Sequence, residues 1–202
     1  MNRILAVTLL ATTLVTAAHA ASDLTHDLAQ VQGGQFVIEP NHTQVAFGIS
    51  HMGFTTYFGH FTDATGTLEL EPAKVAASKL DVTVPTATIN TTSDKLNEEL
   101  RSAQWFDAAK YPTITFHATK VVRSGPTEAR IEGELTLHGV TKPVTLVAHF
   151  NAAGTNPLDK AYTVGFQATG KIKRSDFGIS TYLPLIGDEV DLTLSGAFER
   201  KA

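Results

Sequence analysis

The stretch that decides the fold is RIEGELTLHGVTKPVTLVAHF, residues 130–150. Its first half alternates apolar with charged or polar side chains over residues 131–137, and the alternation returns over residues 144–150. The His-Gly pair at residues 138–139 predicts a tight turn between the two halves. Because successive side chains of a β-strand point to opposite faces, this pattern predicts two antiparallel strands with one apolar and one polar face.

The same alternation continues on both sides of this hairpin, and several of the runs are about ten residues long with short turns between them. Such long runs are typical of a small barrel. We therefore expect an all-β fold, an eight-stranded antiparallel barrel that is either filled by side chains or holds one small ligand. No linker divides residues 34–202, so this region is predicted to be one domain. The alternating runs outside the hairpin are residues 43–51, 66–70, 79–89, 114–118, 162–172 and 190–199.

One segment departs from the strand pattern: TTSDKLNEELRSAQWFDAAKYP, residues 91–112. Two leucines stand four positions apart in it, with charged residues between them. This spacing predicts one short amphipathic helix over about residues 94–102. We expect the segment to lie across one barrel end as a lid. Its side chains that are predicted to face the interior are Leu96, Leu100, Trp105 and Phe106.

The first 20 residues, MNRILAVTLLATTLVTAAHA, are typical of a secretory signal peptide, with Arg3, an apolar run and an A-x-A cleavage site at residues 18–20. Threonines interrupt the apolar run, which is shorter than the roughly 20 residues that span a bilayer, so no stable membrane anchor is expected. Residues 21–33 are predicted to be a mobile lead-in, or at most one helical turn. The chain has no cysteine, so the exported protein relies on packing rather than disulfides.

Charge and motifs exclude several classes of function. The chain has 16 Lys and Arg against 20 Asp and Glu, a net charge of −4, without a basic stripe, so no nucleic-acid partner is expected. It lacks a G-x-S-x-G elbow, a Gly-rich phosphate loop and an H-E-x-x-H motif, and we predict that it is not an enzyme. A spatial Ser-His-Asp arrangement stays open, because triads are not sequential.

The histidines do not predict a metal site, because no pair after residue 20 has the short spacing of metal ligands with supporting carboxylates. No metal or cofactor is expected. His51 and His60 flank an aromatic-rich turn. Two interpretations of this pair stay open: hydrogen-bonded residues at strand ends, or polar contacts to a ligand head group at a barrel mouth.

Aromatic side chains are spread over most of the predicted elements, and small residues such as Gly133, Ala148 and Ala168 lie on the same strands. If the small residues face inward, the barrel keeps apolar volume for a ligand. If they do not, the aromatic side chains form a solid core. The residues predicted to line a cavity are Phe47, Ile49, Phe54, Tyr57, Phe61, Leu96, Leu100, Trp105, Phe106, Phe116, Phe166 and Phe177. The candidates for head-group contact are His51, Arg101 and Arg174, with surface ion pairs as the alternative for the two arginines.

Several runs resemble the YceI family: TINTTSDKLNEELRSAQWFDAAKYPTITFHAT (88–119), GELTLHGVTKPVTL (133–146), HTQVAFGISHMGFTTYFGHF (42–61), GKIKRSDFGI (170–179) and GDEVDLTLSGAFER (187–200). They cover nearly all of residues 34–200 in the family's order. The resemblance implies a lipocalin-like antiparallel barrel that is exported to the bacterial periplasm. It also implies a pocket for a long-chain isoprenoid or a related amphiphile, such as the tail of a prenylquinone.

The helix carries the main departure from that family. Its members usually have an Arg-Asp pair and a His before the Leu-Arg-Ser run, where this chain has Leu96, Asn97 and Glu99. Head-group selection is therefore expected to differ. The leading hypothesis is a periplasmic carrier or sequestering protein for an isoprenoid-tailed lipid or quinone. Two alternatives stay open: an enzyme acting on such a lipid through His51 and Asp176, or a filled barrel that serves as a protein-interaction module. The oligomeric state is open, with a homodimer among the options.

Overall fold

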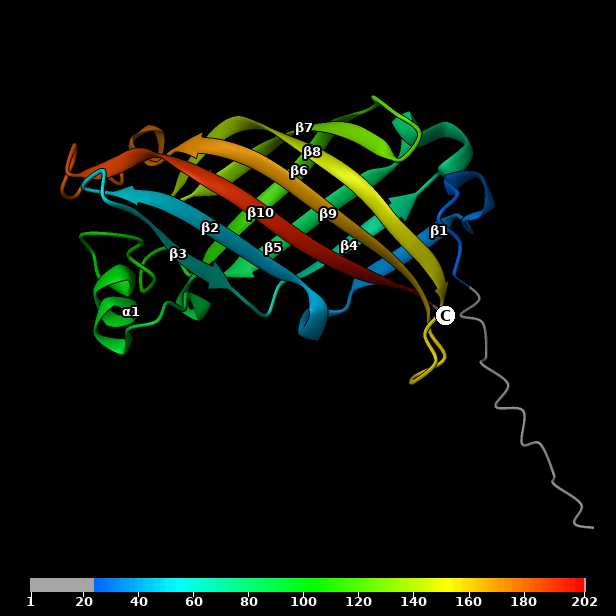
Figure 1. The fold of residues 1–202 in the computed structure, drawn as a ribbon, viewed down its shortest axis with the longest axis horizontal. Coiled ribbons are helices and arrows are strands. Elements are labelled where there is room, and N and C mark those ends of the chain that lie inside the picture. The colour runs from blue at the N-terminus through cyan, green and yellow to red at the C-terminus, as the bar shows by residue number, and fades with distance from the viewer. Residues whose placement is uncertain (1–23, 202) are drawn as a thin grey trace, which may run out of the picture.

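The computed structural model describes residues 24–201. Ten antiparallel strands form one hydrogen-bonded sheet, in the order β1-β4-β5-β6-β7-β8-β9-β10-β2-β3 (Figure 1). The strands are β1 (Gly34–Ile38), β2 (Gln44–His51), β3 (Thr55–Phe61), β4 (Thr65–Leu70), β5 (Lys79–Pro85), β6 (Thr113–Arg123), β7 (Glu128–Leu137), β8 (Val140–Thr155), β9 (Tyr162–Lys173) and β10 (Ile186–Arg200). The 3-10 helices are η1 (Leu28–Gln30), η2 (Pro40–His42), η3 (Pro72–Ala77), η4 (Thr86–Thr88) and η5 (Arg174–Phe177).

The sheet closes on itself because β1 also pairs with β10. Strand β10 is 15 residues long and has room for two partners along one edge. Its residues 186–195 pair with β2, and its residues 198–200 pair with β1. The result is a closed antiparallel barrel of eight strands, as predicted, with β2 and β3 as two extra strands that extend the wall at one end.

The alternation seen in the sequence becomes the inside and the outside of this barrel. On β8, Val144, Leu146, Ala148 and Phe150 are buried, and the residues between them are exposed. Across the hairpin, Ile131 of β7 pairs with Leu146. Apolar side chains of neighbouring strands therefore meet on the inner face, where burial of apolar surface stabilises the fold.

The helix α1 (Asp94–Arg101) lies at one end of the barrel beside β3 (Figure 1). Ser93 is its N-cap, and its Oγ accepts a hydrogen bond from the backbone N–H of Leu96 at 3.3 Å. Such a cap satisfies one of the N–H groups that lack a partner at a helix start. Asn97 and Leu100 are the buried residues of the helix, so the predicted amphipathic pattern places one face against the barrel.

Residues 21–33 were predicted to be a mobile lead-in, or at most one helical turn. The described part of this segment, residues 24–33, contains one 3-10 turn, η1, and packs against the barrel. Thr25 forms a bridge with Ala153, and Leu28 and Val31 join the hydrophobic core. The weak apolar periodicity of this segment hid two anchoring side chains whose partners are distant in sequence. The predicted signal peptide, residues 1–20, lies outside the described residues.

Within residues 24–201, we find no helix that is both long and apolar enough to cross a bilayer.

Candidate functional site

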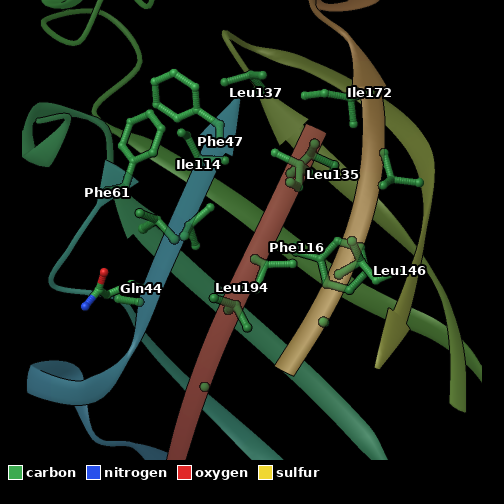
Figure 2. Close-up of a pocket in the computed structure, with 18 of the residues that line it drawn as sticks. Gln44, Phe47, Phe61, Ile114, Phe116, Leu135, Leu137, Leu146, Ile172 and Leu194 are labelled. Atoms are coloured by element: carbon green, nitrogen blue, oxygen red, sulfur yellow. The ribbon is translucent and has the colours of Figure 1, made fainter. Parts of the chain in front are cut away.

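The barrel interior holds a cavity of about 500 Å³. Its volume lies within the usual range of ligand sites, roughly 300–1,000 Å³. The wall is built from the inward residues of nearly every strand, and most of its side chains are aliphatic or aromatic. Figure 2 shows apolar side chains such as Phe116, Leu146 and Leu194, which come from three different strands, around the same interior space. The barrel is therefore not completely filled by its own side chains.

Most of the side chains that were predicted to line a cavity lie in its wall. They are Phe47, Ile49, Tyr57, Phe61, Leu96, Leu100, Trp105, Phe106, Phe116 and Phe166. Two predictions are wrong. Phe54 is exposed at the tip of the β2–β3 hairpin. The last paired residues of this hairpin are His51 and Thr55, so Phe54 lies in the turn, where the alternation of inward and outward side chains no longer applies. Phe177 is fully buried in η5 and belongs to the core, outside the cavity wall.

Glycines keep the lumen open in an indirect way. A Cβ atom built on Gly59 would lie 2.5 Å from the ring of Phe47, and one built on Gly133 would lie 2.4 Å from the ring of Phe116. These rings therefore occupy the space that a side chain would take on the neighbouring strand. Since each ring lies over a glycine backbone, it lies along the wall and leaves the centre of the barrel free.

The segment from α1 to β6, which was predicted to lie across one barrel end as a lid, contributes side chains to the cavity wall. Leu100 is buried, and Phe106 packs edge-on against Phe61 with the ring centroids 5.4 Å apart. Phe61 in turn lies 5.9 Å from Phe47 on β2. The edge-to-face arrangement of Phe106 and Phe61 is favourable for aromatic rings. The two contacts join the lid to the extra strands β2 and β3.

Four polar side chains of the cavity lining lie beside the lid. His51, Tyr57, Glu99 and Tyr182 all contribute to the lining there. The Tyr57 hydroxyl lies 3.2 Å from Thr92 Oγ1, and Glu99 Oε1 accepts a hydrogen bond from Trp105 Nε1 at 3.2 Å. We call this region, defined by His51, Tyr57, Glu99 and Tyr182, the mouth. A polar head group placed there would meet hydrogen-bonding partners while its tail lay in the apolar lumen.

Arg174 also borders the cavity, but its main role is structural. Its guanidinium is buried and donates to three backbone carbonyls: Nε to Gly187 at 2.8 Å, Nη1 to Ile179 at 3.1 Å and Nη2 to Ile186 at 2.9 Å. Its carbon Cζ lies 5.4 Å from the centre of the Trp105 ring. Burial lowers the pKa of Arg174 from its ordinary value, and the charge of Asp188 opposes that shift. The surface ion pair considered from the sequence is thus replaced by a buried clamp on the 179–187 loop.

Arg101 does not reach the cavity wall, which corrects its predicted head-group role. Its Nη2 donates to the carbonyl of Ile89 at 3.4 Å, and its buried Nε has no hydrogen-bond partner among the described residues. The reason is its position in the last turn of α1, which turns the side chain toward the 86–92 segment. The sequence pattern could not separate Arg101 from Arg174, because neither set of carbonyl partners is local.

The residues at the family departure have distinct places. Leu96 and Glu99 line the cavity. Asn97 is buried instead, and its Oδ1 accepts hydrogen bonds from the backbone N–H and the hydroxyl of Thr91 at 2.7 and 2.8 Å. Its Nδ2 donates to Asn90 at 3.1 Å. Asn97 therefore holds the residues that precede the helix in place. Leu96 makes the lid more apolar, and Glu99 brings a carboxylate to the mouth.

Of the remaining titratable groups, Lys79 on β5 also contributes to the lining of the cavity. The described residues contain no group of three or more His, Asp or Glu that could hold a metal ion. Two His-carboxylate pairs are present, His42 with Glu39 at 2.6 Å and His117 with Asp81 at 2.5 Å, and none of the four residues belongs to the wall. They are pairs on the outer surface.

Sequence reasoning missed the aliphatic part of the wall because it weighted aromatic residues. The same period-two pattern that places Phe116 inward also places Ile114, Leu135 and Leu146 inward. The missed aliphatic residues include Leu68, Leu70, Val84, Ile114, Leu135, Leu137, Val144, Leu146, Ile172, Val190, Leu192 and Leu194. Glu99 and Tyr182 were also missed, since no periodicity marks a residue that borders a mouth.

Comparison with known proteins agrees with this architecture. The model of the YceI-like domain matches residues 36–198. Protein YceI of Escherichia coli O6:H1 is 42% identical over 157 residues, which cover 78% of this chain and 81% of that protein. The Campylobacter jejuni YCEI protein has a TM-score of 0.67 at 31% identity, over 76% of this chain and 91% of that one. A polyisoprenoid binding domain from Saccharophagus degradans, implicated in plant cell wall breakdown, has a TM-score of 0.64 at 15% identity, over 84% and 100%.

Proposed function

The chain belongs to the YceI-like family, and on that premise we propose that it binds the apolar tail of an isoprenoid lipid or prenylquinone inside its barrel. The observation that carries the proposal is the apolar cavity of about 500 Å³, whose lining includes a group of polar side chains beside the lid. This polarity matches an amphiphile with a long hydrocarbon tail and a small head group. The polyisoprenoid binding domain of similar fold supports the same class of ligand.

The energetics of such a complex favour loose selectivity. Each buried CH₂ group contributes about 0.8 kcal/mol, so a tail of about 20 carbons would gain ~16 kcal/mol before costs. Ordering a flexible chain and losing its free motion offset a large part of that gain. Because the wall is almost uniformly apolar, length and shape of the tail select the ligand more than any single contact does. Discrimination of the head group falls to the mouth.

An enzymatic role has less support. It would need a titratable pair with shifted pKa values inside the cavity. The suggested partner of His51, Asp176, is exposed and lies outside the wall. We therefore propose a carrier or sequestering protein. The apolar cavity also disfavours the alternative of a filled barrel that acts only as a protein-interaction module.

We place this activity in the bacterial periplasm, on the basis of the signal-like sequence of residues 1–20. Fractionation of cells that produce the full chain tests the location. A cleaved protein in the osmotic-shock fluid is expected, and an uncleaved protein in the cytoplasm would contradict it.

Organic extraction and mass spectrometry of protein that was never exposed to detergent tests the ligand. The wild-type protein is expected to release an isoprenoid-tailed lipid in near-stoichiometric amount. The L100D/F106D double variant places two carboxylates in the lid, which an apolar tail would have to desolvate, and it is expected to lose the lipid. L158D, changed at a residue 90% exposed in the β8–β9 turn, is the matched control.

Circular dichroism must show that the double variant keeps its strand content. A wild-type protein without extractable apolar ligand would refute the proposal. A double variant that retains both its fold and its lipid would show that the α1 segment is not part of the binding wall.

A further inference from the structure

Two loops beside the mouth form an apolar projection. The β2–β3 turn and the loop before β10 are joined by a hydrogen bond from the backbone N–H of Met52 to the carbonyl of Leu185, at 2.8 Å. Both belong to uncharged parts of the chain, since residues 43–62 and 177–187 contain no Lys, Arg, Asp or Glu. In a chain with 36 such charged residues in total, two charge-free segments meet at one place.

The side chains at this place are large and face solvent. Met52 is 50% exposed, Phe54 86%, Tyr182 57% and Leu185 59%. We call these four residues the apolar tip. A single exposed apolar residue on a protein surface needs no explanation, but a contiguous group beside a ligand cavity marks an interaction site.

The backbone of the apolar tip supports a functional reading. Met52 has φ of 53° and Tyr182 has φ of 59°, both in the left-handed region. The backbone N–H of Phe54 donates a hydrogen bond to the carbonyl of His51 at 3.0 Å and closes a tight turn. At the central positions of such a turn, Asn, Asp or Gly is favoured. Bulky side chains are uncommon in this conformation, and such strain concentrates at functional sites. The protein therefore holds apolar side chains outward at positions that suit small polar ones.

The apolar tip also borders the path of the ligand. His51 and Ile186, which pair across β2 and β10 at the base of the tip, both line the cavity, as does Tyr182 itself. A tail that enters or leaves through the mouth passes directly beside these side chains. The apolar tip is thus adjacent to the mouth of the cavity.

We propose that the apolar tip inserts into the surface of a lipid bilayer and places the cavity mouth against the membrane. This inference rests on the proposed function, because the membrane is the place from which a water-insoluble tail is taken or to which it is delivered. Aromatic and aliphatic side chains with a tyrosine among them suit the boundary between head groups and acyl chains. Because these two segments contain no charged residue, the tip itself can insert without desolvation of an ionic group.

Other occupants fit the apolar tip less well. A stable protein interface buries about 800 Å² on each partner, whereas four side chains on two turns form a small projection. Electrostatic adsorption is also disfavoured, because the net charge is −4 and anionic lipids would repel the protein. Insertion is therefore expected at zwitterionic membranes, with little dependence on salt.

Tryptophan fluorescence with phosphatidylcholine vesicles tests this inference on the full mature protein. The chain has one tryptophan, Trp105, which lies in the lid 6.0 Å from the Tyr182 ring, so its own response to vesicles is measured on the wild type and subtracted. F54W is expected to shift its emission to shorter wavelength with vesicles, and to be quenched by a lipid that carries a nitroxide in its acyl chain. L158W is the matched control, because Leu158 is equally exposed but lies in the β8–β9 turn, away from the lid end (Figure 1). It is expected to show neither change.

A second variant, F54S/L185S, measures the contribution of the tip to vesicle binding. Its partition into vesicles is expected to fall about tenfold or more, as for the loss of two buried apolar side chains. Its extracted lipid is expected to equal that of the wild type, because neither residue lines the cavity.

Three results would overturn the inference: an equal response of L158W, unchanged vesicle binding of F54S/L185S, or a shift of F54W emission with protein concentration alone, which would identify a second copy as the occupant. The proposed function fails separately. An empty cavity with normal insertion would refute lipid carriage only, and normal lipid content without insertion would refute the tip only.

Discussion

The replacement Ala148→Phe discriminates an open barrel from a filled one. Ala148 lies on β8 between Ala129 of β7 and Ala168 of β9, so three alanines form one cross-strand row. All three line the cavity. A phenyl ring at the central position would project across the lumen over small neighbours on both sides.

The sign of the stability change depends on whether the space is free. In a close-packed core, added bulk forces strained rotamers and costs about 1–3 kcal/mol. In an empty cavity the ring gains its own burial, about 2 kcal/mol. We therefore expect A148F to be more stable than the wild type when both are free of ligand. With ligand at 100 times its dissociation constant, the wild type gains about 2.7 kcal/mol, and A148F, whose lumen is blocked, gains nothing.

Urea unfolding of ligand-stripped protein, followed by titration with the extracted lipid, measures both quantities. V147F is the matched control, because Val147 is the outward neighbour of Ala148 on the same strand. Its stability is expected to change by no more than about 0.5 kcal/mol, and its response to lipid is expected to equal that of the wild type. Destabilisation of A148F by 1–3 kcal/mol without ligand, or a normal lipid response, would refute the cavity reasoning.

Two further predictions concern the 174–188 region. Arg174→Met is expected to lower the free energy of unfolding by about 3 kcal/mol or more, since it leaves three carbonyls without a donor. Arg174→Lys is expected to recover little of this loss, because an ammonium lacks the fork of the guanidinium. Equal urea midpoints for R174K and the wild type would contradict this prediction. Asp188 accepts hydrogen bonds from the backbone N–H and hydroxyl of Ser175, and the first of these does most to hold its pKa below the ordinary 3.8. Ionised Asp188 therefore stabilises the fold above pH 3.8, and this stabilisation is lost as the pH falls through the lower pKa of the folded protein. D188A is expected to lower the free energy of unfolding by about 1 kcal/mol at pH 7 and by less at pH 2–3. A stability difference that does not change with pH would contradict this prediction.

Most of the barrel strands and α1 could be predicted because their patterns are local. Alternation of apolar and polar residues predicts a strand and its inner face, and the spacing of Leu96 and Leu100 predicts the helix. Alternation also predicts a strand over residues 43–51, but the sequence could not show that β2 and β3 lie outside the closed barrel, because the long edge of β10 decides between β1 and β2 as partners. Phe54 was misplaced for a related reason: a residue beyond the last pair of a hairpin takes its direction from the turn. Arg101 and Arg174 look alike in sequence, and only carbonyls from distant segments distinguish them.

The bridge between His60 and Asn90 gives the barrel wall a line of weakness. Along the rest of the circumference, neighbouring strands are joined by ladders of paired residues. Strands β9 and β10, for example, pair from Thr163 with Glu199 to Lys173 with Glu189. Between β3 and residues 86–92, the backbone hydrogen bonds among the described residues are the two of that bridge, at 2.8 and 2.9 Å. Side-chain hydrogen bonds across the same line join Thr88 Oγ1 to the backbone of Thr62, at 3.0 and 3.2 Å, and Tyr57 to Thr92, at 3.2 Å. Since each hydrogen bond contributes about 1 kcal/mol net, separating β3 from residues 86–92 costs less than separating two strands joined by a long ladder. We therefore expect the barrel wall to open first along this line beside the lid.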